Sequence, residues 1–305
     1  MAARQEDSFM GIAPGGEYLL FRTEDIGSEY RIEEFNWTVA AEKADSAGAD
    51  VINTSLGYSY GFTDPGMDYS YDEMDGQTAM ISRAAAKAVA TGMVVVVSAG
   101  NEGSSSWRYM TAPADTDGVL AVGALAADST IAPFSSLGPT ADDRIKPDVV
   151  SLGVGVPVIN SEGDILNQSG TSFASPIMAG YAALLLQQYP SLTGNEIFGL
   201  IRDSGNQAVP DNTFGFGISY IEIVLSSEPV ISDEKIRIFP VPARSVLYWH
   251  TDQPVDKVNV FDLLGRIMDV PGSSSFIDVS VLRPGIYIIR FVVNGSVRQF
   301  RFVKE

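Results

Sequence analysis

Short, uniformly apolar runs that alternate with alanine-rich helical segments constrain the fold of this chain most strongly. Met93–Ser98 reads MVVVVS, and Asp50–Thr54 and Glu17–Arg22 are runs of the same kind. Strands that lack apolar–polar alternation are buried on both faces, as in parallel sheets covered by helices. A further strand is predicted at Val119–Ala124, and helices are predicted at Glu33–Ala47, Gly76–Ala90 and Ser172–Gln188. This alternation predicts a doubly wound, mostly parallel α/β sheet.

Beyond about Ser226 the pattern changes to short alternating strands separated by turn residues such as Asn294-Gly295. Residues 231–305 hold 10 of the 20 basic side chains but only 8 of the 38 acidic ones, so the charge balance changes as well. This spacing predicts a small all-β sandwich of antiparallel strands. We therefore expect an α/β domain over 1–226, a linker over 227–233 and a sandwich over 234–305. The predicted sandwich strands are Lys235–Phe239, Ser245–His250, Lys257–Phe261, Ile277–Val279, Gly285–Val293 and Ser296–Val303.

Composition excludes several classes of function. The net charge of −18 argues against binding to nucleic acid or to anionic membranes, which both need clusters of Lys and Arg. The chain has no cysteine, so disulfides and thiolate metal sites are excluded. No apolar run approaches the roughly 18 residues of a transmembrane segment. The first residues show no basic-then-apolar signal peptide.

Ser172 lies at the start of a predicted apolar helix, within the run Gly170-Thr171-Ser172-Phe173-Ala174-Ser175-Pro176. A serine in this place has a structural interpretation, which is that it caps free backbone N–H groups. The alternative is a nucleophile held at the positive end of a helix. Gly170 permits an unusual backbone conformation, Ala174 and Ser175 leave space around the hydroxyl, and Pro176 is expected to fall in the first turn.

Two other segments follow buried strands at the edge of the sheet where ligands of α/β proteins bind. Asn101 follows Met93–Ser98, and its amide is either a turn former between glycines or a donor to an oxyanion. Ser55, Leu56 and Gly57 follow Asp50–Thr54. They form either a simple strand exit or an edge that pairs with an extended peptide.

Together, DVINTSLG at 50–57, SAGN at 98–101 and GTSFASP at 170–176 resemble the subtilase family of serine proteases. The resemblance extends over about residues 10–222. It implies that Ser172 is the catalytic nucleophile, that Asn101 lines the oxyanion hole and that Ser55, Leu56 and Gly57 line the substrate-binding S1 pocket. It also implies an endopeptidase that acts on polypeptide substrates and needs no cofactor for its chemistry.

A catalytic base is not identifiable in the sequence. The family's order along the chain is Asp, His, Ser, whereas the single histidine, His250, follows Ser172 and falls in the predicted sandwich. Only ten residues precede the family-like segment Gly11-Ile12-Ala13-Pro14. We expect that the Asp and His lie upstream of a truncated chain, and that the chain as given is inactive and prone to aggregate. A non-catalytic cell-surface binding protein on a pseudoprotease scaffold is the alternative.

The C-terminal segment also resembles a known family. Ile236–Ala243 (IRIFPVPA), Val258–Gly265 (VNVFDLLG) and Leu282–Tyr287 (LRPGIY) are similar to C-terminal sorting domains of the type IX (Por) secretion system. Val241 stands where asparagine is usual. The resemblance implies a partner, the type IX secretion machinery, and a secreted or cell-surface protein. A generic β-sandwich accessory domain is the alternative.

The insert Asp64–Asp75 holds five acidic side chains in twelve residues. Subtilases often bind calcium, so a structural calcium ion is possible, but the spacing is not that of an EF-hand and no metal ligands are assigned. A solvated acidic loop is the simpler interpretation. Tyr58, Tyr60, Tyr69 and Tyr71 nearby either rim a substrate cleft or pack the loop.

Overall fold

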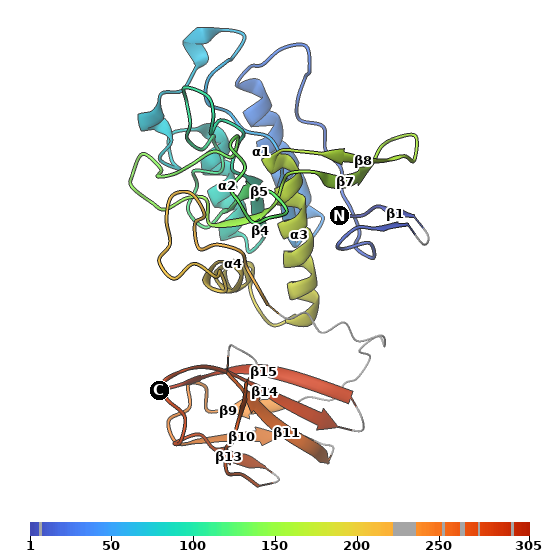
Figure 1. Ribbon diagram of the computed structural model, residues 1–305, viewed down its shortest axis with the longest axis vertical. Helices are drawn as coiled ribbons and strands as arrows, with labels where there is room; N and C mark the ends of the chain where they lie inside the picture. The colour runs from blue at the N-terminus through green and yellow to red at the C-terminus, as the bar shows by residue number, and fades with distance from the viewer. Residues whose placement is uncertain (6–7, 222–235, 252–253, 263–265, 274, 294–295) are drawn as a thin grey trace. The chain divides into compact units, whose positions relative to one another are not determined.

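The computed structural model describes residues 1–5, 8–221, 236–251, 254–262, 266–273, 275–293 and 296–305 (Figure 1). The chain divides into two compact units, Met1–Leu225 and Ser226–Glu305. The predicted linker 227–233 lies outside the described residues.

The first unit is built on a four-stranded parallel sheet. Its strands run in the order β3 (Val51–Thr54), β4 (Val94–Ser98), β5 (Leu120–Leu125) and β6 (Val149–Leu152). Every residue of β4 and β5 is buried. This burial explains why these strands are apolar throughout, because helices cover both faces of the sheet.

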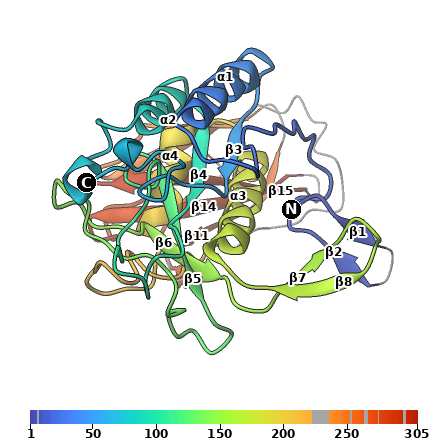
Figure 2. The same ribbon diagram turned by 90° about the horizontal axis from the view of Figure 1, so that it is seen from above.

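Helices lie on both faces of this sheet (Figure 2). Val95 and Val97 share a core with α1 (Ile32–Ser46) and α2 (Met80–Ala90). Val94 and Val96 point the other way, into a core with α3 (Thr171–Gln188) and α4 (Gly194–Asp203). Alternate residues of one strand therefore serve two cores, and the prediction of a doubly wound sheet is confirmed.

The strand predicted at Glu17–Arg22 is wrong. The segment forms no strand, and Leu19, Leu20 and Phe21 are 54%, 91% and 46% exposed. The reason is that a strand needs a hydrogen-bonded neighbour. Among the described residues, β3 is an edge strand that pairs with β4 alone, and no strand lies beside Glu17–Arg22.

The helix predicted at Gly76–Ala90 begins later, at Met80. Asp75 explains the shift, because its Oδ1 accepts the N–H groups of Gln77 (2.8 Å) and Thr78 (2.7 Å) and holds them in a turn. The sequence patterns also missed α4, β6 and several short elements of the first unit. The short elements are β1 (Arg4–Gln5), β2 (Phe9–Met10), β7 (Val156–Ile159), β8 (Ile165–Gln168) and two 3₁₀ turns, Pro65–Met67 and Tyr71–Glu73.

The second unit has two antiparallel sheets around one core, as the alternating pattern predicts. One sheet has the order β13 (Phe276–Asp278), β10 (Val246–His250), β9 (Arg237–Phe239). The other has the order β12 (Ile267–Met268), β11 (Val255–Phe261), β14 (Gly285–Val293), β15 (Ser296–Lys304). Leu247 from the first sheet and Ile289 and Phe291 from the second meet in the core. The turn predicted at Asn294-Gly295 lies outside the described residues.

Helices that could cross a lipid bilayer were sought in the described part of the chain. None there combines the necessary length and apolar character.

Candidate active site

Ser172 is the second residue of α3, directly after a glycine with a backbone that other residues rarely adopt. Gly170 is buried and has a φ of 150°, so its replacement by another residue would be strained. The Ser172 N–H lies in the first turn of the helix, where backbone donors have no intrahelical acceptor. The side chain is half-buried, and its Oγ donates to the carbonyl oxygen of Ser55 (3.3 Å).

Pro176 does not lie in the first turn of α3, as the sequence suggested, but in the second. In an α-helix that begins at Thr171, the N–H of residue 176 would donate to the carbonyl of Ser172. Proline has no N–H, so this carbonyl is free of the helix ladder. The Ser55 hydroxyl donates to it instead (3.0 Å). Because of the proline, the Ser172 carbonyl is available to accept from Ser55, and this hydrogen bond connects the end of β3 to the start of α3.

Asn101 follows β4 through Gly100, which has a φ of 105°. Its Oδ1 accepts two hydrogen bonds from Thr171, one from the backbone N–H (2.9 Å) and one from the hydroxyl (3.0 Å). The backbone N–H can only donate, so it requires an oxygen at that end of the amide, and the orientation of the group is determined. The Nδ2 donor at the other end of the amide has no hydrogen-bond acceptor among the described residues. Asn101 is exposed, so this donor is open to solvent. Asn101 therefore caps α3 and keeps a free donor beside the start of the helix.

Ser55, Leu56 and Gly57 extend β3 as an open edge. No backbone hydrogen bond within the described residues uses the peptide groups of Leu56 or Gly57. The next residue, Tyr58, makes two backbone bonds of 2.9 Å with Ala112, so the chain is paired again there. A Cβ on Gly57 would lie 2.1 Å from Thr111 Oγ1, so this position accommodates only glycine. This short unpaired edge has the form that an extended peptide can join.

One further residue of the site, Asn53, was not singled out from the sequence, and Ser175 was expected only to leave space around the Ser172 hydroxyl. Buried Ser175 donates through its Oγ to Asn53 Oδ1 (2.7 Å), and Asn53 Nδ2 donates to Ser55 Oγ (3.3 Å). Hydrogen bonds therefore run from α3 to β3 and back to the Ser172 carbonyl. Asn53 and Ser55 are two residues apart and so lie on one side of the strand, which was the only signal in the sequence. Ser175, which donates to Asn53, lies 122 residues further along the chain.

The tyrosines near this edge divide between the two expected roles. Tyr58 and Tyr69 are 2% and 5% exposed and pack in the core with Phe62. Tyr60 is exposed, its ring centre lies 5.7 Å from that of Trp107, and its hydroxyl donates to Glu102 (2.6 Å), the residue after Asn101. This hydrogen bond to the carboxylate raises the pKa of Tyr60. Tyr60 thus lies exposed beside the residue that follows Asn101, whereas the Tyr71 hydroxyl donates to the carbonyls of Pro139 (3.0 Å) and Thr140 (3.1 Å).

The sole histidine of the chain, His250, lies on β10 in the second unit, whereas Ser172 and Asn101 belong to the first. The first unit therefore supplies a hydroxyl, an amide donor and a helix N-terminus, but no imidazole. Such a set can stabilise an anion that forms on a carbonyl oxygen. Removal of the serine proton requires a base in addition.

Comparison with known proteins agrees with this arrangement. The profile of the Subtilase family matches residues 1–217. Subtilisin DY from Bacillus licheniformis is 34% identical over 182 residues, which cover 59% of this chain and 58% of that protein. Serine protease AprX from Bacillus subtilis (strain 168) is 32% identical over 191 residues, covering 55% of this chain and 41% of AprX. The chain thus spans less than two thirds of the length of these curated relatives.

A solved structure supports the fold, and a second profile matches the other unit. The crystal structure of MycP1 with the N-terminal propeptide removed superposes with a TM-score of 0.54 at 24% identity, covering 71% of this chain and 72% of MycP1. The profile described as a secretion system C-terminal sorting domain matches residues 237–305, which supports sorting by type IX secretion. Because the first profile covers most of the chain and agrees with its sheet, its helices and its motifs, the chain belongs to the Subtilase family.

Proposed function

We propose that this protein is a secreted serine endopeptidase that cleaves polypeptides through an acyl-enzyme on Ser172. The single observation that carries the proposal is the Asn101 amide, whose oxygen is held by Thr171 and whose Nδ2 donor is left free beside the first turn of α3. A donor that is already oriented stabilises charge that exists only in the transition state, without reorganisation during the reaction.

In the proposed reaction, Ser172 Oγ attacks the carbonyl carbon of a peptide that has joined the Ser55–Gly57 edge. A base takes the hydroxyl proton, and the carbonyl oxygen becomes an anion that accepts from Asn101 Nδ2 and from the Ser172 N–H. The intermediate collapses to an acyl-serine, and the leaving amine departs with the proton. Water then attacks the ester by the same route in reverse and frees the serine.

The base is the component that the residues of the first unit do not supply. We therefore propose that the 305-residue chain by itself is inactive. In subtilisin, loss of the triad histidine alone lowers turnover by about 10⁶-fold. The hydrolysis of a peptide by the purified chain should equal that of its Ser172→Ala variant. A rate above that of Ser172→Ala would show that the chain contains its own base.

An external base tests the nucleophile directly. With imidazole in solution and an activated aryl ester as substrate, we expect hydrolysis that exceeds the Ser172→Ala background and saturates with substrate. The variant measures the reaction of imidazole alone and is the matched control. Equal rates in the two proteins would contradict the role of Ser172.

The second candidate function, a binding protein on a protease scaffold, is favoured by one observation, the unpaired peptide edge at Leu56 and Gly57 in a unit that has no histidine. Such a protein would bind extended peptides without acyl transfer. The same ester experiment separates the two functions, because a binder shows no Ser172-dependent turnover with imidazole.

We further propose that the second unit directs the protein to the type IX secretion machinery, with a secreted or cell-surface destination. Its match to the sorting-domain profile over 237–305 supports this role. A reporter with an export signal, fused to residues 226–305 and produced in a bacterium with that system, should reach the medium or cell surface. Retention in the periplasm, as for the reporter without the fusion, would contradict it.

A further inference from the structure

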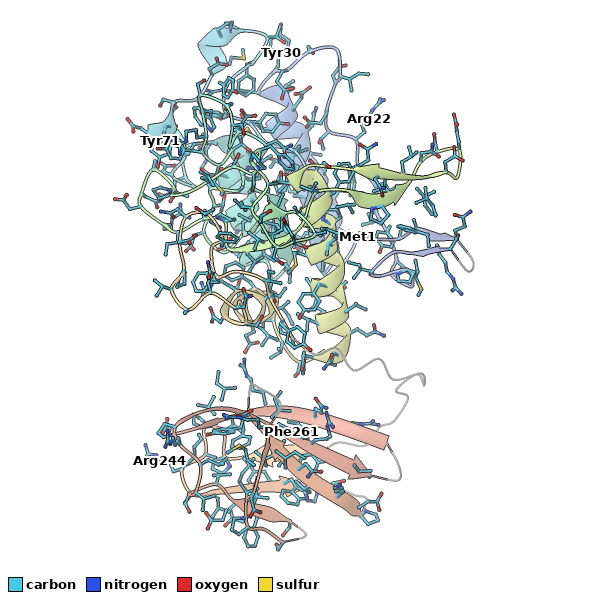
Figure 3. All side chains as sticks on the ribbon, in the orientation of Figure 1. Met1, Arg22, Tyr30, Tyr71, Arg244 and Phe261 are labelled. Atoms are coloured by element: carbon cyan, nitrogen blue, oxygen red, sulfur yellow. The ribbon has the colours of Figure 1, made fainter. Side chains whose placement is uncertain are left out.

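Three glutamates converge just before and within the first turn of α1, in a part of the molecule that the proposed protease chemistry does not use. Glu24, Glu29 and Glu33 each place one carboxylate oxygen within 4.8 Å of the oxygens of the other two. We call these residues the three-glutamate cluster. Arg22 and Tyr30, both labelled in Figure 3, flank the segment that carries the first two.

Glu33 carries the second, independent observation. Its side chain is buried, with 2% of the residue exposed. Oε1 accepts the N–H of Asp25 (2.8 Å), but Oε2 is buried without a hydrogen-bond partner in the described structure. The next residue, Glu34, is also buried, yet both of its oxygens are bonded, to the Tyr69 hydroxyl (2.8 Å) and the Ile81 N–H (3.0 Å). A buried carboxylate oxygen that accepts no hydrogen bond is costly, and Glu33 differs from Glu34 in this respect.

No cationic side chain in the described residues neutralises the cluster. Arg31, two residues from both Glu29 and Glu33, donates instead to the Met67 carbonyl (2.6 and 2.8 Å), and its guanidinium carbon lies 4.0 Å from the centre of the Tyr69 ring. Like charges at such short range repel strongly unless a cation lies between them.

We propose that Glu24, Glu29 and Glu33 bind one calcium ion. The donors are all carboxylate oxygens, which hard divalent cations prefer. Oxygens bound to one calcium ion at 2.3–2.6 Å can be at most about 5 Å apart, which the spacing within the cluster satisfies. Magnesium needs shorter, nearly octahedral coordination and retains several waters, so a half-buried, irregular trio of glutamates favours calcium.

The ion would fasten the segment before α1 to the chain that follows the candidate substrate edge. Glu24 Oε1 accepts from the Tyr58 hydroxyl (2.6 Å), and Tyr58 comes directly after Gly57. Glu29 and Thr63 exchange two further bonds, from Glu29 N to Thr63 Oγ1 (2.9 Å) and from Thr63 N to the Glu29 carbonyl (2.8 Å). Calcium at the cluster would therefore stabilise the first unit whether or not Ser172 is catalytic.

Calorimetric titration of the full 305-residue chain with CaCl₂, after removal of metal with a chelator, tests the site. We expect one saturable site for calcium and at least 10-fold weaker binding of MgCl₂. Glu29→Gln should weaken calcium binding by at least about 10-fold, because loss even of an outer-shell group commonly costs that much. The Glu29 side chain makes no hydrogen bond to the backbone in the described structure, so this variant should fold. Glu42→Gln, an exposed position on α1 with the same charge change, is the matched control and should bind like the parent chain.

Thermal unfolding gives a second measurement that does not depend on calorimetry. Calcium should raise the melting temperature of the parent and of Glu42→Gln, because it binds only the folded state. Glu29→Gln should lose this increase, and without calcium it should melt no lower than the parent, because one of three repelling charges is gone. Absence of saturable binding at about 1 mM calcium, the weak end for extracellular sites, would overturn the proposal. Equal affinity in the parent and Glu29→Gln, or equal affinity for magnesium, would overturn it as well.

Discussion

At the scale of single residues, the candidate active site depends on an amide whose two ends have different tasks. The Asn101 oxygen holds the start of α3 through Thr171, and its nitrogen is free to donate. Asn101→Asp separates these tasks, because aspartate keeps an oxygen for Thr171 but has no donor. We expect the variant to retain the melting temperature of the parent within a few degrees. Its Ser172-dependent ester hydrolysis with imidazole should fall at least as far as the ~10²–10³-fold known for loss of the oxyanion asparagine in subtilisin. Unchanged hydrolysis would exclude Asn101 as the donor.

A substitution at Gly57 gives a second test at this scale, because Thr111 occupies the space that a side chain at position 57 would need. A methyl group there would meet Thr111 Oγ1, so Gly57→Ala should destabilise the first unit by about 1–3 kcal/mol. Gly199→Ala is the control, since nothing lies within 4 Å of a Cβ at that position in the interior of α4. It should stabilise the unit by up to about 1 kcal/mol, because alanine is the better helix former. Denaturant unfolding measures both, and a stable Gly57→Ala variant would contradict this packing.

At the scale of elements, a buried ion pair joins the loop before β6 to β5. Lys146 and Asp148 are 3% and 5% exposed, and Lys146 Nζ lies 2.6 Å from Asp148 Oδ2. Lys146 also donates to the Val119 carbonyl, and Asp148 Oδ2 accepts the Ala121 N–H. Asp148→Asn keeps an acceptor for that N–H but leaves the ammonium unpaired, so we expect a loss of about 3–5 kcal/mol in the free energy of unfolding.

The double variant Lys146→Met/Asp148→Asn is the control for this pair, because it removes both charges. It should recover most of the lost stability, since an apolar replacement of a buried pair is often nearly neutral. A double variant as unstable as Asp148→Asn would show that hydrogen bonds, rather than the unpaired charge, determine the cost.

At the scale of the whole molecule, the first unit exposes several large apolar side chains near its N-terminal end. Leu19, Leu20 and Phe21 are exposed, and so are Ile32, Phe35 and Val39 on α1, at 60%, 47% and 47%. Apolar patches of this kind promote association. We expect the purified chain to self-associate as its concentration rises, and a Leu20→Glu/Phe35→Glu variant to do so less. Light scattering coupled to gel filtration measures both, and a monomeric parent at all concentrations would contradict the expectation.

The sequence predicted the most apolar strand and the longest helix, but it missed β6 and also α4, which begins with a local capping box at Thr193. β4 and α3 were predicted to within two residues because burial dictates their composition. Glu17–Arg22 has strand composition but no neighbour to pair with among the described residues. The motifs located Ser172 and Asn101, yet the orientation of the amide depends on Thr171, 70 residues away.

The acidic residues illustrate the same limit. The segment Asp64–Asp75 was considered as a calcium site because it is dense in acidic residues. In the structure, however, Asp64, Asp68 and Asp75 accept hydrogen bonds from backbone N–H groups of turns in the same loop. Glu24, Glu29 and Glu33 are sparser in sequence and converge only because the chain bends into α1. Density of charge along the chain therefore does not predict convergence in space.

Identification of the acylated residue tests the central claim most directly. The purified chain, supplied with imidazole and an activated ester, would be quenched in acid and analysed by mass spectrometry of its peptides. We expect one acyl group, on Ser172, which is absent from Ser172→Ala and strongly reduced in Asn101→Asp. Acylation spread over other side chains, or unchanged by Asn101→Asp, would contradict a nucleophile assisted by an oxyanion donor at this site.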